Sequence, residues 1–306
     1  MTDASLSRDS RRLIAPAELK VLSARSDARG LLRLGIHLGL IGLSSALIWQ
    51  AGETLWLLPA MLLQGLFLIA LFATIHETVH YTAFKTRWLN ESVGWFAALP
   101  SLLNATYYKH FHLAHHRHTQ DPARDPELTP PPPTTRRQFW WRMTAIPYWI
   151  GRFRSLGKLA VGNFAGADFV PEKVRDEVVR SVQLMIAFYA LVIASALAMG
   201  SAWPLLYWIV PVVIAQPFLR AYLLTEHTGC SEDANGLTNT RTTLASWPIR
   251  LLMWNMPFHV EHHLYPSIPF HALPALHGKI RDDLAHLAPG YLPTLRDIHA
   301  DLGRAA

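Results

Sequence analysis

Long stretches without a charged side chain limit what this chain can fold into more than any other feature. They cover residues 34–52, 54–75 and 181–219. A helix needs about 20 apolar residues to cross the roughly 30 Å core of a bilayer, so the first two stretches predict one crossing each. The third is long enough for two crossings joined by a turn at Gly200 and Ser201. We therefore expect an all-α integral membrane protein whose four transmembrane helices form two hairpins, with spans at about 34–50, 55–75, 182–199 and 203–222.

The basic residues predict the orientation of these spans. All 28 Lys and Arg residues fall in 1–33, 76–180 and 220–306, and none lies in the turns between the paired spans. Positive residues stay on the cytoplasmic side of membrane proteins, so we expect both termini and the 76–180 segment to be cytoplasmic. The net charge of +6 is then explained by anionic lipid headgroups, without a nucleic-acid partner.

The order of apolar and polar segments predicts the domain organisation. We expect a cytoplasmic N-terminal segment over 1–30, a membrane domain over 31–275 and a cytoplasmic tail over 276–306. The start MTDASLSRDSRR lacks the apolar core of a signal peptide, so the first span is the expected insertion signal.

Three shorter segments carry further expectations. Residues 68–86 contain neither Gly nor Pro, which predicts that the second helix continues past the membrane to residue 86. Residues 94–103 are apolar but too short to cross, which indicates a re-entrant or interfacial piece. Residues 139–153 mix aromatic and basic side chains, as is typical of a segment at the headgroup level.

Three groups of histidines have the spacing of metal ligands. Residues i, i+3 and i+4 of a helix share one face, so an HxxxH or HxxHH motif can direct its imidazoles to a common centre. Eight imidazoles are more than one structural zinc uses and are enough for two metal ions. Imidazole suits iron, copper, zinc and nickel, so the ligand type leaves the metal open. The motifs are His76 and His80; His112, His115 and His116; and His259, His262 and His263.

The lone cysteine narrows the alternatives. Because Cys230 is the only one, an internal disulfide and a Cys-only iron–sulfur site are excluded.

The histidine pattern bears on two other classes of metal-binding membrane protein. A metal transporter would place polar ligands inside the spans, and here only His37 lies well within a span. A di-zinc hydrolase stays open, and it would need neither O2 nor an electron donor.

The order, spacing and position of the motifs resemble the histidine boxes of integral-membrane fatty acid desaturases and their hydroxylase and ketolase relatives. The resemblance covers about residues 30–275. HETVHYTAFKTRWLNE (76–91) and HLAHHRHTQDPARDPE (112–127) look most like a bacterial branch that includes hydrocarbon oxygenases. The resemblance implies a cytoplasmic helical cap with a non-haem di-iron centre, which uses O2 as co-substrate on an unactivated alkyl chain. It also implies a location in a bacterial inner membrane.

The resemblance also implies a partner and leaves the product open. The chain lacks the HPGG motif of a fused cytochrome b5, so electrons would come from a separate ferredoxin, rubredoxin or cytochrome. Our leading hypothesis is a desaturase acting on a fatty acyl or lipid-like chain. The alternative is a hydroxylase or ketolase of a hydrocarbon, carotenoid or small amphipathic metabolite, because the boxes are the same for both.

Further site residues follow from the resemblance and from general metal-site chemistry. The family usually supplies a ninth histidine just after the last span, which is His227 here. Some relatives have an asparagine one turn earlier, which contacts the metal through water. This chain has Leu223 there, and Asn255 is the residue that could supply such a contact instead. Ligating histidines usually donate their other N–H to a carboxylate or carbonyl. The candidate carboxylates are Glu77, Asp121, Asp125, Glu226 and Glu261.

The remaining histidines are expected to have lesser roles. His110 and His118 flank the second box as supporting candidates, and no catalytic residue is expected beyond the metal centre. The others are expected to be structural or solvated: His37, His271, His277, His286 and His299.

Overall fold

The computed structural model describes residues 13–302, and this part of the chain is mostly helical with almost no strand. Its two strands, β1 (Thr242–Thr243) and β2 (Leu287–Ala288), form one short parallel pair. Four helical segments are long and apolar enough to cross a membrane, as predicted. They are α3 (Asp27–Ala51); α4 (Leu57–Val79); Glu172–Ala198, which contains η4 (Glu172–Val174) and α9 (Arg175–Ala198); and Leu205–His227, which contains η5 (Leu205–Ile209) and α10 (Val210–His227).

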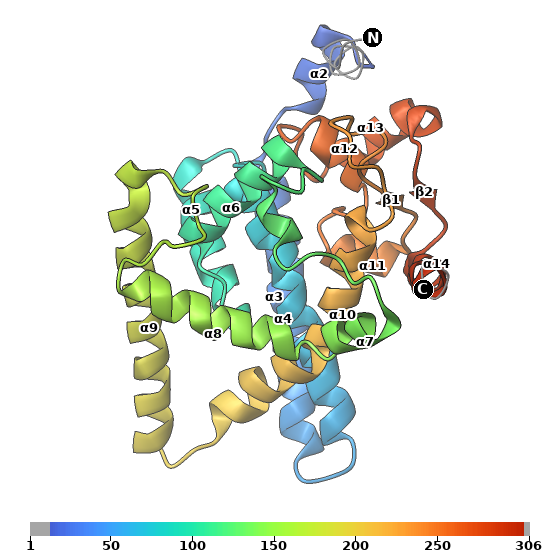
Figure 1. Cartoon of the computed structure of the whole chain (residues 1–306). Helices are drawn as coiled ribbons and strands as arrows, with labels where there is room; N and C mark the ends of the chain where they lie inside the picture. Colours follow the sequence, from blue (N-terminus) through green and yellow to red (C-terminus); the bar gives the residue numbers. More distant parts are fainter. Residues whose placement is uncertain (1–12, 303–306) are drawn as a thin grey trace.

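Helix α4 is the centre of the molecule. Its apolar window is 72% buried, whereas the windows of α3 and α9 are each 17% buried. A helix that is apolar all round belongs in an interior, and α3 and α9 expose apolar side chains as lipid-facing helices do. Figure 1 shows α3 and α10 against α4, while α9 and α10 diverge from the turn that joins them.

The two inter-helix turns lie at one end of the molecule and the histidine-bearing helices at the other (Figure 1). The second and third boxes are on α6 (Ala105–His118) and α12 (His259–Leu264). Between the two ends, α8 (Ile146–Ala160) lies across the long helices. The segment 139–153 falls in α7 (Arg136–Met143) and α8, and exposes Trp140, Trp141 and Phe153.

The second helix is shorter than predicted. Helix α4 ends at Val79, and Tyr81 has a left-handed φ of 57°. The Thr82 N–H and hydroxyl both donate to the Glu77 carbonyl, which turns the chain back. Propensity alone could not show this, because the turn depends on a side chain that reaches back by five residues.

The turn lets the next helix pack against α4. Helix α5 (Arg87–Ala98) and η2 (Leu99–Ser101) contain residues 94–101 of the stretch expected to be re-entrant or interfacial. A Cβ at Gly94 would lie 2.5 Å from the Thr78 hydroxyl, so this crossing requires glycine.

Smaller elements complete the end that carries the histidines. The boundary predicted at residue 275 falls inside α13, and the domain limits remain a prediction. The remaining elements are α2 (Pro16–Leu22), η3 (Pro126–Leu128), α11 (Trp247–Leu252), α13 (Leu273–Ile280), η6 (Arg281–Asp283) and α14 (Tyr291–Asp301).

The contact between α4 and α10 is testable through Gly65. A Cβ there would lie 1.9 Å from the Pro211 carbonyl oxygen, so Gly65→Ala must separate the two helices. We expect Gly65→Ala to lower the free energy of unfolding by about 1–3 kcal/mol. The measurement is the thermal unfolding temperature in detergent, which should fall. Gly39→Ala in α3 is the control, since its Cβ meets nothing within 4 Å. Equal unfolding temperatures for the two variants would show that the close approach is unimportant.

Candidate metal centre

Nine histidines from four parts of the chain converge at the end of the molecule opposite the inter-helix turns. They are the eight box residues and His227, at the end of α10. Two groups have ligand atoms that all lie within 4.8 Å of one another. The first group is His76, His80, His112, His116 and His262; the second is His115, His227 and His263. His259 adjoins the second group, with its Nε2 atom 3.1 Å from the His227 Nε2 atom.

Each HxxHH box is divided between the two groups. In α6, His112 and His116 belong to the first group and His115 to the second. In α12, His262 belongs to the first and His263 to the second. Adjacent residues of a helix point about 100° apart, so one short helix supplies ligands to two neighbouring centres. The second and third boxes therefore link the two groups.

The nitrogen positions in the first group fit a shared cation. The Nε2 atom of His116 lies 3.0 Å from the Nε2 atoms of both His112 and His262. One imidazole nitrogen either donates or accepts, so it cannot satisfy both neighbours by hydrogen bonds. Ligand nitrogens about 2.1 Å from one ion lie about 3 Å apart when they occupy adjacent positions at right angles. Neither ring nitrogen of His76 has a hydrogen-bond partner among the described residues.

Burial keeps these rings neutral. It lowers the pKa of His80 to about 3 and the pKa values of His112, His116 and His262 well below their ordinary value. Positive charge on neighbouring histidines would lower them further. A neutral imidazole offers a lone pair to a metal, so the site is prepared for a cation at neutral pH.

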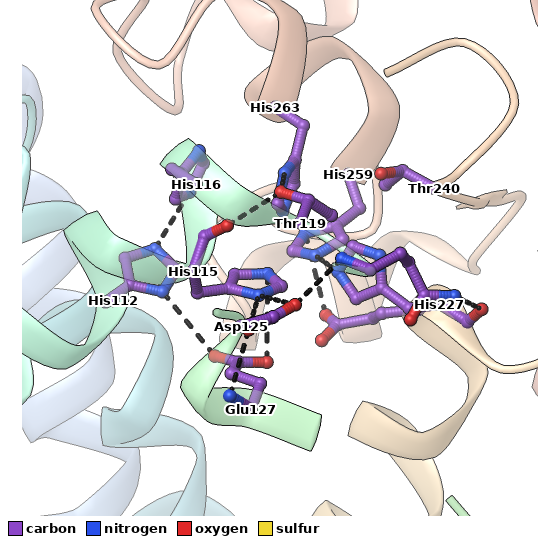
Figure 2. Close-up of polar contacts among 12 residues, drawn as sticks. His112, His115, His116, Thr119, Asp125, Glu127, His227, Thr240, His259 and His263 are labelled. Atoms are coloured by element: carbon purple, nitrogen blue, oxygen red, sulfur yellow. Dashed lines mark hydrogen bonds and ion pairs between the residues drawn. The ribbon is translucent and has the colours of Figure 1, made fainter. Parts of the chain in front are cut away.

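In the second group, hydrogen bonds fix which nitrogen faces the centre (Figure 2). The His115 Nδ1 atom lies 3.0 Å from both carboxylate oxygens of Asp125. A carboxylate only accepts, so Nδ1 carries the proton and Nε2 is left for a ligand. His227 Nδ1 likewise donates to the Asn239 carbonyl at 3.1 Å. The His263 Nδ1 atom lies 3.3 Å from the Thr119 hydroxyl, which leaves its Nε2 buried without a partner.

Asp125 is itself held in place. Its carboxylate accepts backbone N–H groups from Gln120 and Glu127, each at 2.9 Å. Burial lowers the pKa of His115, but the carboxylates of Glu127 and Asp125 outweigh burial and raise it overall. Asp125 is therefore the predicted carboxylate with a direct hydrogen bond to a box histidine.

The other candidates have different partners. Glu226 approaches His259, with 3.7 Å between Oε1 and Nδ1. Glu77 accepts from the Thr82 hydroxyl at 2.8 Å and the Phe270 N–H at 3.2 Å. Asp121 lies in an exposed turn and pairs with Arg124.

Glu261 and Asn255 brace the chain around the third box. Glu261 accepts from the Thr242 hydroxyl and contacts His277 Nδ1, both at 2.5 Å. His277 thus has a structural role, which was one of the two roles expected for it. Asn255, the substitute considered for a metal contact, donates its amide to the Phe270 carbonyl at 3.0 Å.

Sequence reasoning missed Glu127. Its carboxylate lies 3.7 Å from His112 Nδ1 and 3.8 Å from His115 Nε2, so it faces both groups (Figure 2). Burial raises its pKa. The available signal was the Asp-Pro-Glu order: Asp125 caps the short helix η3, and Pro126 begins it. That turn brings Glu127 beside His112 and beside His115, the histidine that Asp125 orients. His110 and His118 belong to neither group.

Comparison with known proteins agrees with this geometry. The family model described as "Fatty acid desaturase" matches residues 26–294. The chain is 24% identical to the sn-1 oleoyl-lipid 12-desaturase of Synechocystis sp., over 85% of this chain and 77% of the relative. It is 25% identical to the sn-1 oleoyl-lipid 12-desaturase of Anabaena variabilis, over 77% of this chain and 72% of the relative. It is 26% identical to the dihydrorhizobitoxine desaturase of Bradyrhizobium elkanii, over 70% of this chain and 65% of the relative.

Removing the Asp125 carboxylate tests the geometry of the second group. We expect Asp125→Ala to weaken metal binding there by about 10- to 100-fold, because His115 loses the partner that orients it. The measurement is metal retained per chain during titration with a chelator. Asp121→Ala removes a carboxylate from the same loop without touching a histidine, and it should retain metal as the wild type does. Indistinguishable retention in the two variants would rule out the orienting role.

Proposed function

Because the chain belongs to the fatty acid desaturase family, we propose that it is an O2-dependent membrane oxidoreductase that introduces a double bond into the aliphatic chain of a fatty acyl or lipid-like substrate. The observation that carries the proposal is the convergence of nine histidines, eight of them in two groups and His259 beside the second group. The four apolar helices and the membrane desaturases among the relatives agree with a membrane enzyme.

We assign two iron ions to the two groups. The first would be held by His76, His80, His112, His116 and His262, and the second by His115, His227, His259 and His263. Bound iron would supply the activation of O2 and the removal of hydrogen from an unactivated carbon. All-histidine ligation also suits zinc and copper, so the choice of iron rests on the family.

The protein's own residues hold the substrate and exclude water. Aromatic side chains lie beside the first group. The ring centroids of Phe72 and His76 are 6.4 Å apart, and Tyr108 stacks on His112 with a centroid distance of 5.3 Å. His76, His112 and His262 are each at most 2% exposed. A dry, rigid surrounding keeps one carbon–carbon segment of a chain beside the centre and limits side reactions.

Desaturation is favoured over the hydroxylase or ketolase alternative. The relatives described above are named as desaturases, and two of them as desaturases of an oleoyl lipid. We extend only the reaction type and a lipid-like substrate to this chain. Loss of two hydrogens gives the alkene, whereas recapture of oxygen would give an alcohol.

Topology and electron supply complete the proposal. Two membrane hairpins would place both termini and the histidine-bearing end on the cytoplasmic side of a bacterial inner membrane, with residues 31–275 as the membrane domain. The distribution of Lys and Arg supports this orientation. A ferredoxin, rubredoxin or cytochrome-type protein would deliver electrons from outside the chain.

The test is expression with a matched reductase and mass spectrometry of lipids and amphipathic metabolites. We expect a product two hydrogens lighter than its precursor, formed only with O2 and with iron bound. His112→Ala should lower turnover at least 100-fold and reduce bound iron, because it removes a ligand from the first group. His286→Ala is the control, since that ring belongs to neither group. A product 16 mass units heavier, or full activity with zinc under anaerobic conditions, would contradict the proposal.

A further inference from the structure

A charged residue in the last apolar helical segment has no described acidic side chain within ion-pair distance. Arg220 of α10 forms no ion pair with any residue from 13 to 302, and its Nε atom is buried without a hydrogen-bond partner. An ionisable group inside a span is costly and commonly marks a substrate or ion site. Arg220 precedes His227 by seven residues, which places it on the same face of α10 about 10 Å along the axis.

A second arginine shares the same aromatic ring. The Arg220 guanidinium carbon lies 4.3 Å from the centre of the Tyr148 ring, and that of Arg152 in α8 lies 5.5 Å from it. Arg152 also has a buried, unpartnered Nε and no ion pair within the described chain. Two like charges on one ring repel each other, so an anion between them would relieve an unfavourable arrangement.

Nearby groups add donors and no paired anion. The charge of Arg142 in α7 also acts on Arg220, and Arg142 donates to the Pro131 carbonyl at 3.4 Å. Gln216, one turn before Arg220, is fully buried and approaches the Tyr148 hydroxyl. Neither amide atom of Gln216 forms a hydrogen bond of normal geometry with a described residue. The acids Glu127 and Glu226 both act on Arg220, but neither forms an ion pair with it.

Tyr148 fixes the floor of this cluster. Its hydroxyl donates to the Ser101 carbonyl at 2.5 Å, so the ring cannot turn to satisfy the arginines. Buried polar groups are nearly always paired in folded proteins. Two guanidinium Nε atoms without partners in the described chain, and an amide without a hydrogen bond of normal geometry, lie around this fixed ring, and such unsatisfied groups are the features of a binding site.

We propose that Arg152 and Arg220 bind the oxyanion head group of the substrate, a carboxylate or a phosphate, beside Tyr148 and Gln216. A guanidinium donates two parallel hydrogen bonds to such a group. The proposal rests on the proposed function, because it takes the histidine groups as the place where the substrate reacts. It narrows the substrate to an amphipathic anion. Its head would be held about two helical turns from His227 while its aliphatic chain extends toward the histidines.

Binding can be measured without turnover. Full-length protein in uncharged detergent, kept free of O2, is titrated calorimetrically with dodecanoate, dodecyl phosphate and methyl dodecanoate. We expect Arg152→Gln and Arg220→Gln each to weaken binding of at least one anion by about 10- to 100-fold, and to leave binding of the ester unchanged. The anion affected identifies the source: a carboxylate indicates a free acid, and a phosphate indicates a phospholipid.

Arg154→Gln is the matched control, because Arg154 is an exposed arginine two residues along α8. It should bind both anions as the wild type does. Wild-type affinity of both tested variants for both anions, or an equal loss in Arg154→Gln, would overturn the proposal.

Thermal unfolding without ligand separates binding from a structural role. A ligand site predicts that Arg220→Gln unfolds at or above the wild-type temperature, because an unpaired charge has been removed. A lower temperature together with unchanged anion affinity would assign Arg220 to structure and overturn the proposal. Arginine-dependent anion binding in a protein that forms no alkene would refute the proposed function and leave the anion site in place.

Discussion

The burial of many neutral imidazoles at one end of the long helices is the constraint on which the rest of the structure depends. Their nitrogens face one another at about 3 Å, where they cannot all be paired by hydrogen bonds. A shared cation satisfies such an arrangement and mutual hydrogen bonding does not. The surrounding protein must therefore hold four separate segments at fixed positions, because misplaced rings would leave buried polar atoms unsatisfied.

The acids near the boxes supply much of this support, and they do so in different ways. Asp125 acts directly on a ring, whereas Glu77 joins the end of α4 to the backbone at Phe270, and Glu261 joins α12 to His277 of α13 and to Thr242. Each carboxylate is shielded from water and has more than one partner. Such shared contacts keep the ligand-bearing helices from moving independently.

Helix α10 connects the apolar helices to the histidine groups. One face of it carries Gln216, Arg220 and His227, so the same helix supplies residues to the proposed head-group site and to the second histidine group. The packing of α10 on α4 requires Gly65, which lets the two backbones approach. A change at that contact would alter the distance between the groups that hold the substrate and the groups that hold the metal.

The sequence by itself determined the four apolar helices and the box spacing, because helix periodicity and hydropathy are local properties, while the choice of His227 came from the resemblance to the family. It also pointed to Asp125, which sits beside a box. It could not show that α4 ends at Val79, since that turn depends on a side chain reaching back from Thr82. The division of each HxxHH box between two groups, the approach of Glu127 to both, and the pairing of Arg152 with Arg220 over Tyr148 were decided only by tertiary structure. Each of these depends on how helices distant in sequence are rotated and packed against one another, and no local pattern encodes that.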